Sequence, residues 1–415
     1  MLALAVLAPW IVRALGYVVL MPALAVSGLA TIYAARCAAN VPAPTGLVIV
    51  IGFALAMRLA LVGVDPLFST DIYRYVWDGR VQAAGINPYL YVPADPALAA
   101  LRDAAIYPFI NRADYAVTGY PPLAEMFFLI ATRVSETLTG MRLAMVACEA
   151  VIVVVLIALL RRLGRPDAAV VAYAWHPLAV FEIANNGHVE ALMVALMMLG
   201  VWLLVCTRRV AGAFVVGLAV VVKPYAVFAL PAFWRPWDWR APLAVIAAIV
   251  LCYLPYLGAG KGVLGFLGGG YLAEEGLLGG EGIWLVMSIQ RIFGTVPGLA
   301  TVYAIVAAVT MIALGFAISL RREWTPQQRL GDIVLLLTAG LFLLSPNYAW
   351  YWLALVPFLA LGAGAPVWAL TLAAFFLYRP LFLPENDLIW KSLATLPFVI
   401  ALVVCRGRLM RSGEA

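Results

Sequence analysis

Charged residues are scarce in this chain. Only 12% of its 415 residues are Asp, Glu, Lys or Arg, whereas 65% are hydrophobic and the mean hydropathy is +1.00. Soluble domains carry about 25% charged residues. A soluble fold of this length could not bury so much apolar surface, so the composition excludes that class and predicts a protein whose solvent is lipid.

Histidine, metal-binding cysteine motifs and phosphate-cradling glycine loops are also lacking. The chain has two histidines, His176 and His188, and its five cysteines are scattered through apolar segments. These numbers and spacings argue against a metal centre, and no Walker-type loop points to a nucleotide. We therefore expect no metal and no other cofactor. The net charge of +6 comes largely from arginines in short loops, a membrane-protein pattern that gives no reason to expect nucleic acid.

Long apolar runs predict an all-α polytopic membrane protein, a single domain over residues 1–415 with about 13 spanning or half-spanning helices. The N-terminus lacks the basic stretch of a cleaved signal peptide, so we expect it to be retained. Segment 211–234 is interrupted at Lys223 and predicts a hairpin with Lys223 at its tip. Runs of spanning length occur at 14–35, 45–64, 141–160, 168–184, 189–206, 241–258, 299–320, 330–345, 349–364, 366–383 and 388–405.

Five arginine clusters set the expected orientation. An even number of spans separates them if segments 121–137 and 283–294 lie along the surface or re-enter, so all five can be cytoplasmic. The long loop 65–119 then lies outside the cytoplasm. We therefore predict a multi-pass protein of the cell membrane whose polar features converge on the outer face. The clusters are 161–165, 208–209, 235–240, 321–329 and 406–411.

Loop 65–119 is long and polar, with six Asp and four Arg. Long loops in compact domains are uncommon unless they are functional. Asp71, Arg74, Tyr75 and Asp78 follow one another at helical spacing, so on a helix they form one polar stripe. A carboxylate in such a stripe can take the proton from an attacking hydroxyl. The pattern also fits a solvated interfacial helix with intrahelical Asp–Arg pairs, and both interpretations stay open.

Basic residues within or beside apolar segments form a second candidate set. Such cations are costly in a membrane and commonly functional, and a phosphate at the outer leaflet would account for them. The alternative is that side chains near helix ends reach the interface. The set is Arg58, Lys223, Arg291, Arg379 and Lys391.

A third set lies between two predicted spans. Its amide and carboxylate groups suit the hydroxyls of a sugar, although His188 taken alone also fits an ordinary loop histidine. The set is Glu182, Asn185, Asn186, His188 and Glu190.

The order of these segments resembles the GT-C superfamily of membrane glycosyltransferases, and especially the mannosyltransferases that use polyprenyl-phosphate mannose. The resemblance covers most of the chain, although each motif alone is weak. The matching segments are Asp71 to Tyr89, Tyr120 to Leu123, Asn186 to Glu190, Gly217 to Pro231 and Ser345 to Tyr351.

This resemblance implies a GT-C-like bundle with a large first outer loop. It implies inverting transfer of a hexose, mannose in particular, from a polyprenyl-phosphate sugar donor to a glycan or glycolipid acceptor at the outer membrane face. The superfamily's base is an aspartate of the first outer loop, which corresponds to Asp71. Lys223, with Arg58 or Arg74, would bind the donor phosphate. Substrate contacts are expected from Tyr75, Asp78, Arg80, Asn87, Tyr89, Asn186, His188, Glu190, Asn347 and Tyr348.

One departure from the family pattern is Thr70, which stands where many bacterial members carry an acidic residue beside the base. A transporter or flippase of a lipid-linked sugar or anion is the main alternative, because it would use the same cations without chemistry. Transporters often show internal repeats, and none is apparent here. A non-catalytic envelope subunit is a third possibility, but it makes no use of the Asp71 stripe.

Overall fold

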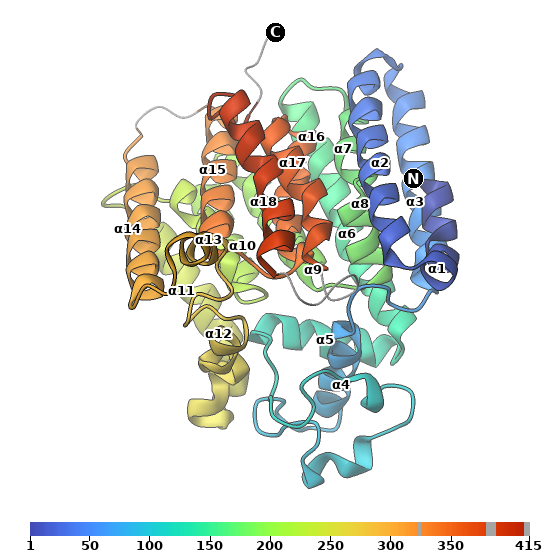
Figure 1. The fold of residues 1–415 in the computed structure, drawn as a ribbon. Helices are drawn as coiled ribbons and strands as arrows, with labels where there is room; N and C mark the ends of the chain where they lie inside the picture. The colour runs from blue at the N-terminus through green and yellow to red at the C-terminus, as the bar shows by residue number, and fades with distance from the viewer. Residues whose placement is uncertain (322–324, 379–386, 411–415) are drawn as a thin grey trace.

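The computed structural model describes residues 1–321, 325–378 and 387–410. Over these residues the chain forms α-helices and shorter 3₁₀ segments, and no β-strand is present. Figure 1 shows most of the helices side by side in one bundle, with α4 (Asp71–Ala83) and α5 (Pro122–Val134) together at one end. The predicted all-α fold is confirmed.

Seven helices of the described residues are long and apolar enough to cross a membrane. All seven coincide with apolar runs predicted from the sequence. They are α2 (Tyr17–Cys37), α3 (Ala43–Val62), α6 (Leu138–Arg162), α11 (Arg240–Tyr253) with the 3₁₀ segment Leu254–Gly268 and α12 (Gly270–Glu274), α14 (Leu299–Ser319), α15 (Pro326–Leu344) and α18 (Asp387–Val404).

The other predicted spans are shorter or divided. Pro177 interrupts 168–184, because proline lacks the N–H that a continuous helix needs. Gly16, with φ 73°, separates α1 (Leu2–Leu15) from α2. The remaining segments are α7 (Val171–Ala174), α8 (Pro177–Ala179), the π-helical turn Val180–Asn185, α9 (Glu190–Val205), α16 (Val356–Ala360), α17 (Ala365–Ala373) and the 3₁₀ segments Ala38–Asn40, Pro96–Leu101, Tyr107–Phe109, Asp167–Val170, Ala349–Leu355 and Ala374–Leu377.

The predicted hairpin around Lys223 is present. Helix α10 (Arg209–Val220) ends just before it, and a 3₁₀ segment (Pro224–Phe233) returns. The Arg209 guanidinium at the start of α10 donates to the carbonyl oxygen of Phe233 at 3.3 Å, so the two ends of the hairpin meet. Lys223 therefore lies at the tip, where Pro224 stops the helix.

The two segments predicted to lie along the surface or re-enter, 121–137 and 283–294, each contain a helix too short to cross a membrane. Helix α5 has 13 residues and α13 (Trp284–Phe293) has 10, which correspond to about 20 Å and 15 Å against an apolar core of about 30 Å. Figure 1 shows α5 lying across the ends of the bundle helices. Helix α5 in this position does not count as a span, so the number of spans between the arginine clusters on either side of it stays even.

Several of the predicted arginine clusters gather at the end of the bundle away from α4 and α5. Arg209 forms an ion pair with Asp238, and Asp332 forms ion pairs with both Arg321 and Arg329. In Figure 1, α15 (Pro326–Leu344), which carries Arg329 near its start, begins at this end. The bundle thus has an arginine-rich end and an opposite end that carries the polar loop.

Candidate active site

A cavity of about 960 Å³ lies where the polar loop meets the bundle. Most of its lining comes from four distant parts of the chain: loop 65–119, the tip of the 211–234 hairpin, α12 and the turn 345–351. Aromatic rings make up much of the wall, which suits the apolar faces of sugars and lipid chains. Its charged residues are Asp71, Arg74, Arg112, Lys223, Glu274 and Glu275.

Asp71 is the first residue of α4, and only 9% of its surface is exposed. The amide group of Asn111 donates to the carboxylate at 2.7 Å, and the backbone N–H of Asp71 donates to Ser69 Oγ at 3.2 Å. A helix N-terminus carries partial positive charge, so it favours a carboxylate there. The side chain is thereby held at the cavity wall in a defined orientation.

Lys223 contributes a cation from the hairpin tip. Its Nζ lies 3.0 Å from an oxygen of Glu190, a fully buried residue at the start of α9. The ammonium group also lies over the rings of Tyr120 and Tyr351, 5.2 Å and 5.9 Å from their centroids. The buried carboxylate and the two rings fix the cation while leaving it part of the cavity lining.

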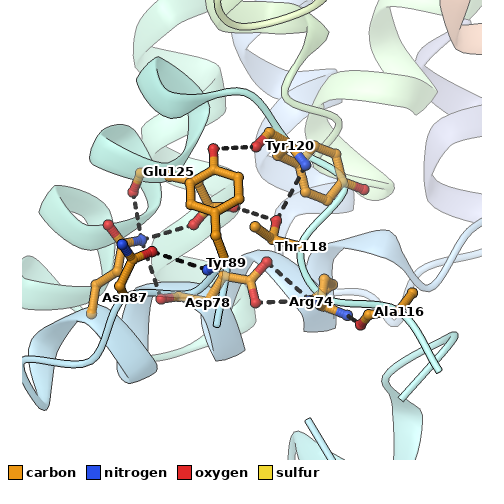
Figure 2. Close-up of polar contacts among 9 residues, drawn as sticks. Arg74, Asp78, Asn87, Tyr89, Ala116, Thr118, Tyr120 and Glu125 are labelled. Atoms are coloured by element: carbon orange, nitrogen blue, oxygen red, sulfur yellow. Dashed lines mark hydrogen bonds and ion pairs between the residues drawn. The ribbon is translucent and has the colours of Figure 1, made fainter. Parts of the chain in front are cut away.

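Arg74 belongs to the polar network drawn in Figure 2. Its Nε donates to both oxygens of Asp78 at 2.8 and 2.9 Å, and its Nη1 donates to the carbonyl oxygen of Ala116 at 3.1 Å. Its Nη2 has no hydrogen-bond partner among the described residues. The guanidinium is thus fixed through two of its nitrogens, and the third is itself buried.

Glu125 of α5 closes the same network. Its carboxyl group accepts from Thr118 Oγ1 at 2.6 Å and from the amide of Gln82 at 2.8 Å. Burial, followed by the nearby charge of Asp78, raises the pKa of Glu125 well above its usual value. This network ties α4, α5 and the end of loop 65–119 into one unit (Figure 2).

Comparison with known proteins bears on what this cavity does. The family model for the N-terminal domain of alpha-(1->6)-mannopyranosyltransferase matches residues 2–237, more than half of the chain. The chain belongs to this family. It is also 30% identical over 175 residues to alpha-(1->6)-mannopyranosyltransferase A of Mycobacterium tuberculosis. That alignment covers 42% of this chain and 34% of the relative, so the chain spans about a third of the curated protein it matches. No solved structure matches.

Family membership confirms the predicted resemblance to membrane mannosyltransferases. The matched segment contains Asp71, Arg112 and Lys223, but it ends before α12 and the turn 345–351. The family match therefore covers one wall of the cavity, and the opposite wall is known from the structure alone.

The structure brings five of the predicted site residues to the cavity. Besides Asp71, Arg74 and Lys223, these are Asn347 and Tyr348. The Asn347 amide donates to the Glu275 carboxylate at 2.6 Å, and the Tyr348 ring stacks on Trp350 at 4.3 Å. These five remain candidates for contact with substrate in this mannopyranosyltransferase family member.

Five other predicted substrate contacts of loop 65–119 do not line the cavity. The Tyr75 ring stacks on Phe128 at 4.5 Å inside the α4–α5 interface. Arg80 forms ion pairs with Asp103 and Glu136. These contacts indicate that the group positions α4 and its loop. The five are Tyr75, Asp78, Arg80, Asn87 and Tyr89.

Asn87 and Tyr89 illustrate this positioning role. The Asn87 amide donates to the carbonyl oxygen of Tyr256 at 3.3 Å, and the Tyr89 hydroxyl donates to that of Tyr120 at 2.7 Å. Both contacts fasten the segment after α4 to neighbouring parts of the chain. The Asn87 and Tyr89 side chains therefore hold the loop in place and do not line the cavity.

Asn186, His188 and Glu190 lie beneath the cavity and are fully buried. The His188 ring stacks on Trp350 at 4.2 Å, and its Nε2 lies 3.3 Å from a Glu182 oxygen. The Asn186 amide donates to the same carboxylate at 2.8 Å. These residues lie behind residues that line the cavity, such as Trp350, and do not line it themselves.

Arg58 requires a correction. Its guanidinium donates to both oxygens of Glu149 in α6, at 3.0 and 2.5 Å, and to the carbonyl oxygen of Ala174 at 2.5 Å. It is 5% exposed and does not line the cavity. A membrane-buried arginine can be satisfied by a carboxylate partner as well as by a ligand, and the sequence does not show that Glu149 faces it.

None of the other three predicted cations is found in the cavity lining of the described residues. Lys391 is buried and donates to the carbonyl oxygen of Ser345 at 2.9 Å, whereas Arg291 is exposed at the end of α13. Arg379 lies outside the described residues. No group of three or more His, Cys, Asp or Glu side chains suited to a metal ion occurs among the described residues.

Sequence reasoning missed several cavity residues. Asn111 and Arg112 lie far along loop 65–119 from Asp71, and only the path of the loop brings them back to it. Glu274 and Glu275 are adjacent acidic residues inside a glycine-rich apolar stretch. This pattern in the sequence could have identified them as candidate site residues. Several aromatic lining residues lie outside the segments that matched the family and were not predicted, namely Tyr17, Phe68, Tyr115, Phe266, Tyr271 and Tyr378.

Proposed function

We propose that this protein transfers mannose from polyprenyl-phosphate mannose to a hydroxyl group of a glycan or glycolipid acceptor. The observation that carries the proposal is the placement of Asp71 and Lys223 on one cavity of a polytopic membrane protein that belongs to a mannopyranosyltransferase family. A base for the acceptor and a cation for the leaving phosphate are the two groups that such a transfer needs.

The proposed reaction is a direct displacement with inversion at the anomeric carbon. The acceptor oxygen forms a bond to that carbon as the bond from the carbon to the phosphate oxygen breaks. The acceptor proton goes to the Asp71 carboxylate, and the bond pair leaves with the polyprenyl phosphate. Asn111 orients the carboxylate for this step through its 2.7 Å hydrogen bond.

Lys223 and Arg74 are proposed to stabilise the phosphate as its negative charge grows. Their ion pairs with buried carboxylates keep both cations in place before substrate arrives, so little reorganisation is needed in the transition state. The aromatic wall would pack against the sugar rings and the first isoprene units.

We further propose that the cavity faces away from the cytoplasm. The arginine clusters lie at the opposite end of the bundle, and cytoplasmic loops carry an excess of arginine. A lipid-linked donor fits this side, because nucleotide sugars are made in the cytoplasm whereas a lipid carrier stays in the membrane.

The test is a transfer assay with purified full-length protein in detergent. Polyprenyl-phosphate mannose, glucose and arabinose are supplied with short mannose oligosaccharides, and polyprenyl phosphate and products are followed by mass spectrometry. The proposal predicts release of polyprenyl phosphate with the mannose donor, coupled to a product one hexose longer. Lipid movement across liposomes without release of polyprenyl phosphate would instead support a flippase.

A further inference from the structure

Each of the three cations that line the cavity is paired with a carboxylate, but the pairs differ in exposure. The carboxylates that hold Arg74 and Lys223 are at most 2% exposed. Arg112 instead pairs with Glu274, Nε to Oε1 at 2.6 Å, and these side chains are 22% and 31% exposed. The Arg112–Glu274 pair is therefore the only one of the three that lies open to the cavity on both sides.

Arg112 stands next to the proposed base. Its neighbour Asn111 donates to Asp71, so the backbone that positions one also positions the other. Arg112 itself adopts a left-handed conformation, with φ 57°. A residue other than glycine keeps this conformation only where the surroundings hold it, and such residues are commonly found at functional sites.

Glu274 comes from a different part of the chain. It is the last residue of α12. The segment before α12 contacts loop 65–119 at several further points, such as the Phe266 N–H, which donates to the Thr118 carbonyl oxygen at 3.0 Å. The Tyr115 hydroxyl also donates to Glu274 at 3.2 Å. The ion pair thus joins two separate segments across the cavity.

The charges of the cavity lining balance. The cations Arg74, Arg112 and Lys223 are matched by three acidic residues, Asp71, Glu274 and Glu275. A phosphate that enters adds negative charge to this balanced lining, so its binding is favoured when one of the carboxylates moves away from its cation. Parting a buried pair is costly, whereas a partly exposed pair opens at little cost. Arginine also binds phosphate with the same two-pronged geometry that it uses for carboxylate.

We propose that the Arg112–Glu274 ion pair is an exchangeable contact: the phosphate of the lipid substrate displaces Glu274 and binds Arg112. This inference rests on the proposed function. It adds Arg112 as a third phosphate-binding residue and Glu274 as a carboxylate that competes with the phosphate for Arg112. Displacement releases Glu274, the last residue of α12, from Arg112, while the Phe266–Thr118 hydrogen bond still joins the segment before α12 to loop 65–119.

The test measures binding of polyprenyl phosphate to the full-length protein in detergent by tryptophan fluorescence, with no sugar transfer required. Glu274→Gln leaves Arg112 without its competitor, and we expect about two- to fivefold tighter binding. Arg112→Gln is expected to weaken binding about tenfold or more. The double variant should behave like Arg112→Gln. Asp167→Asn removes a carboxylate from another partly exposed ion pair, with Arg161, outside the cavity lining, and should bind like wild type.

The outcomes separate the inference from the proposed function. Equal weakening by Glu274→Gln and Arg112→Gln would show a structural latch and overturn the exchange. Unchanged binding in Glu274→Gln would overturn it as well, and this variant alone decides if Arg112→Gln fails to fold. Absence of binding to the wild type would instead refute the polyprenyl-phosphate donor itself.

Discussion

At the residue scale, the structure divides the predicted polar residues into two layers. Asp71, Arg74 and Lys223 line the cavity, whereas Asp78 and Glu190 lie behind them and hold the cations. Both layers contain charged residues of similar kinds, so the sequence alone does not tell one layer from the other. Their roles differ only in which side chains reach the cavity, and this depends on how the elements pack.

Asn111 offers a test of positioning at this scale. Asn111→Ala removes the hydrogen bond that orients the Asp71 carboxylate. We expect kcat to fall about ten- to a hundredfold, because small displacements of a reacting group are costly. The affinity for polyprenyl phosphate should stay near that of wild type, since the cations are untouched. Equal activity in the variant and wild type would remove Asn111 from the site.

Glu125 gives a pH-dependent prediction. Its pKa in the folded protein is raised above the usual 4.5, so the folded state binds the proton more tightly than the unfolded state. Its contribution to stability is therefore complete below pH 4.5 and is lost as the pH rises towards the pKa in the folded state. The thermal inactivation temperature of the wild type should fall more steeply above pH 4.5 than that of Glu125→Gln. Parallel pH curves for the two proteins would contradict this.

At the element scale, α4 and α5 form one packed unit that carries the proposed base. A methyl group added at Gly79 of α4 would lie 2.6 Å from the Phe128 carbonyl oxygen and closer still to Thr132 Oγ1. Gly79 is thus required for the close approach of the two helices. The position of Asp71 at the start of α4 depends on this contact.

Gly79→Ala should therefore force the two helices apart. We expect a loss of stability of about 1–3 kcal/mol, the usual cost of overpacking, together with reduced transfer activity. Gly63→Ala is a matched control, because nothing lies within 4 Å of the added methyl group and φ is −94°. The comparison is made by thermal inactivation in detergent, and similar curves for the two variants would refute the packing argument.

Much of the bundle could be predicted from sequence, because a run of about 20 consecutive apolar residues has the length and composition that cross a bilayer as a helix. The hairpin at Lys223 could also be predicted, since proline leaves the chain little choice there. The cavity could not be predicted in the same way. Arg58 and Lys223 are both cations in apolar segments, and only packing shows that Glu149 satisfies one while the other reaches the cavity.

At the scale of the whole molecule, the two ends of the bundle differ in chemistry. One end carries arginines, and the other carries the cavity, the polar loop and α5 lying across it (Figure 1). This asymmetry agrees with the arrangement predicted from the arginine clusters. The proposed reaction then takes place on the side of the membrane opposite to those clusters.

Single-cysteine labelling tests that orientation. In a background without the partly exposed Cys37, Cys206 and Cys405, Asp103→Cys should react with a membrane-impermeant maleimide in intact cells. Arg162→Cys, at the end of α6 on the arginine-rich end, should react only after the cells are broken. Labelling of residue 162 from outside would invert the proposed topology.

The central claim is that Asp71 is the base of a sugar transfer, and the rate of transfer by Asp71→Asn tests it most directly. Asparagine keeps the shape of the side chain but cannot take the acceptor proton. The account predicts a rate about 10² to 10⁴ lower, or about 3–5 kcal/mol of barrier, with binding of polyprenyl phosphate unchanged. Asp114→Asn, at an exposed aspartate of the same loop outside the cavity lining, should transfer like wild type. If Asp71→Asn retains more than about a tenth of the wild-type rate, well above what loss of a general base allows, Asp71 is not the base.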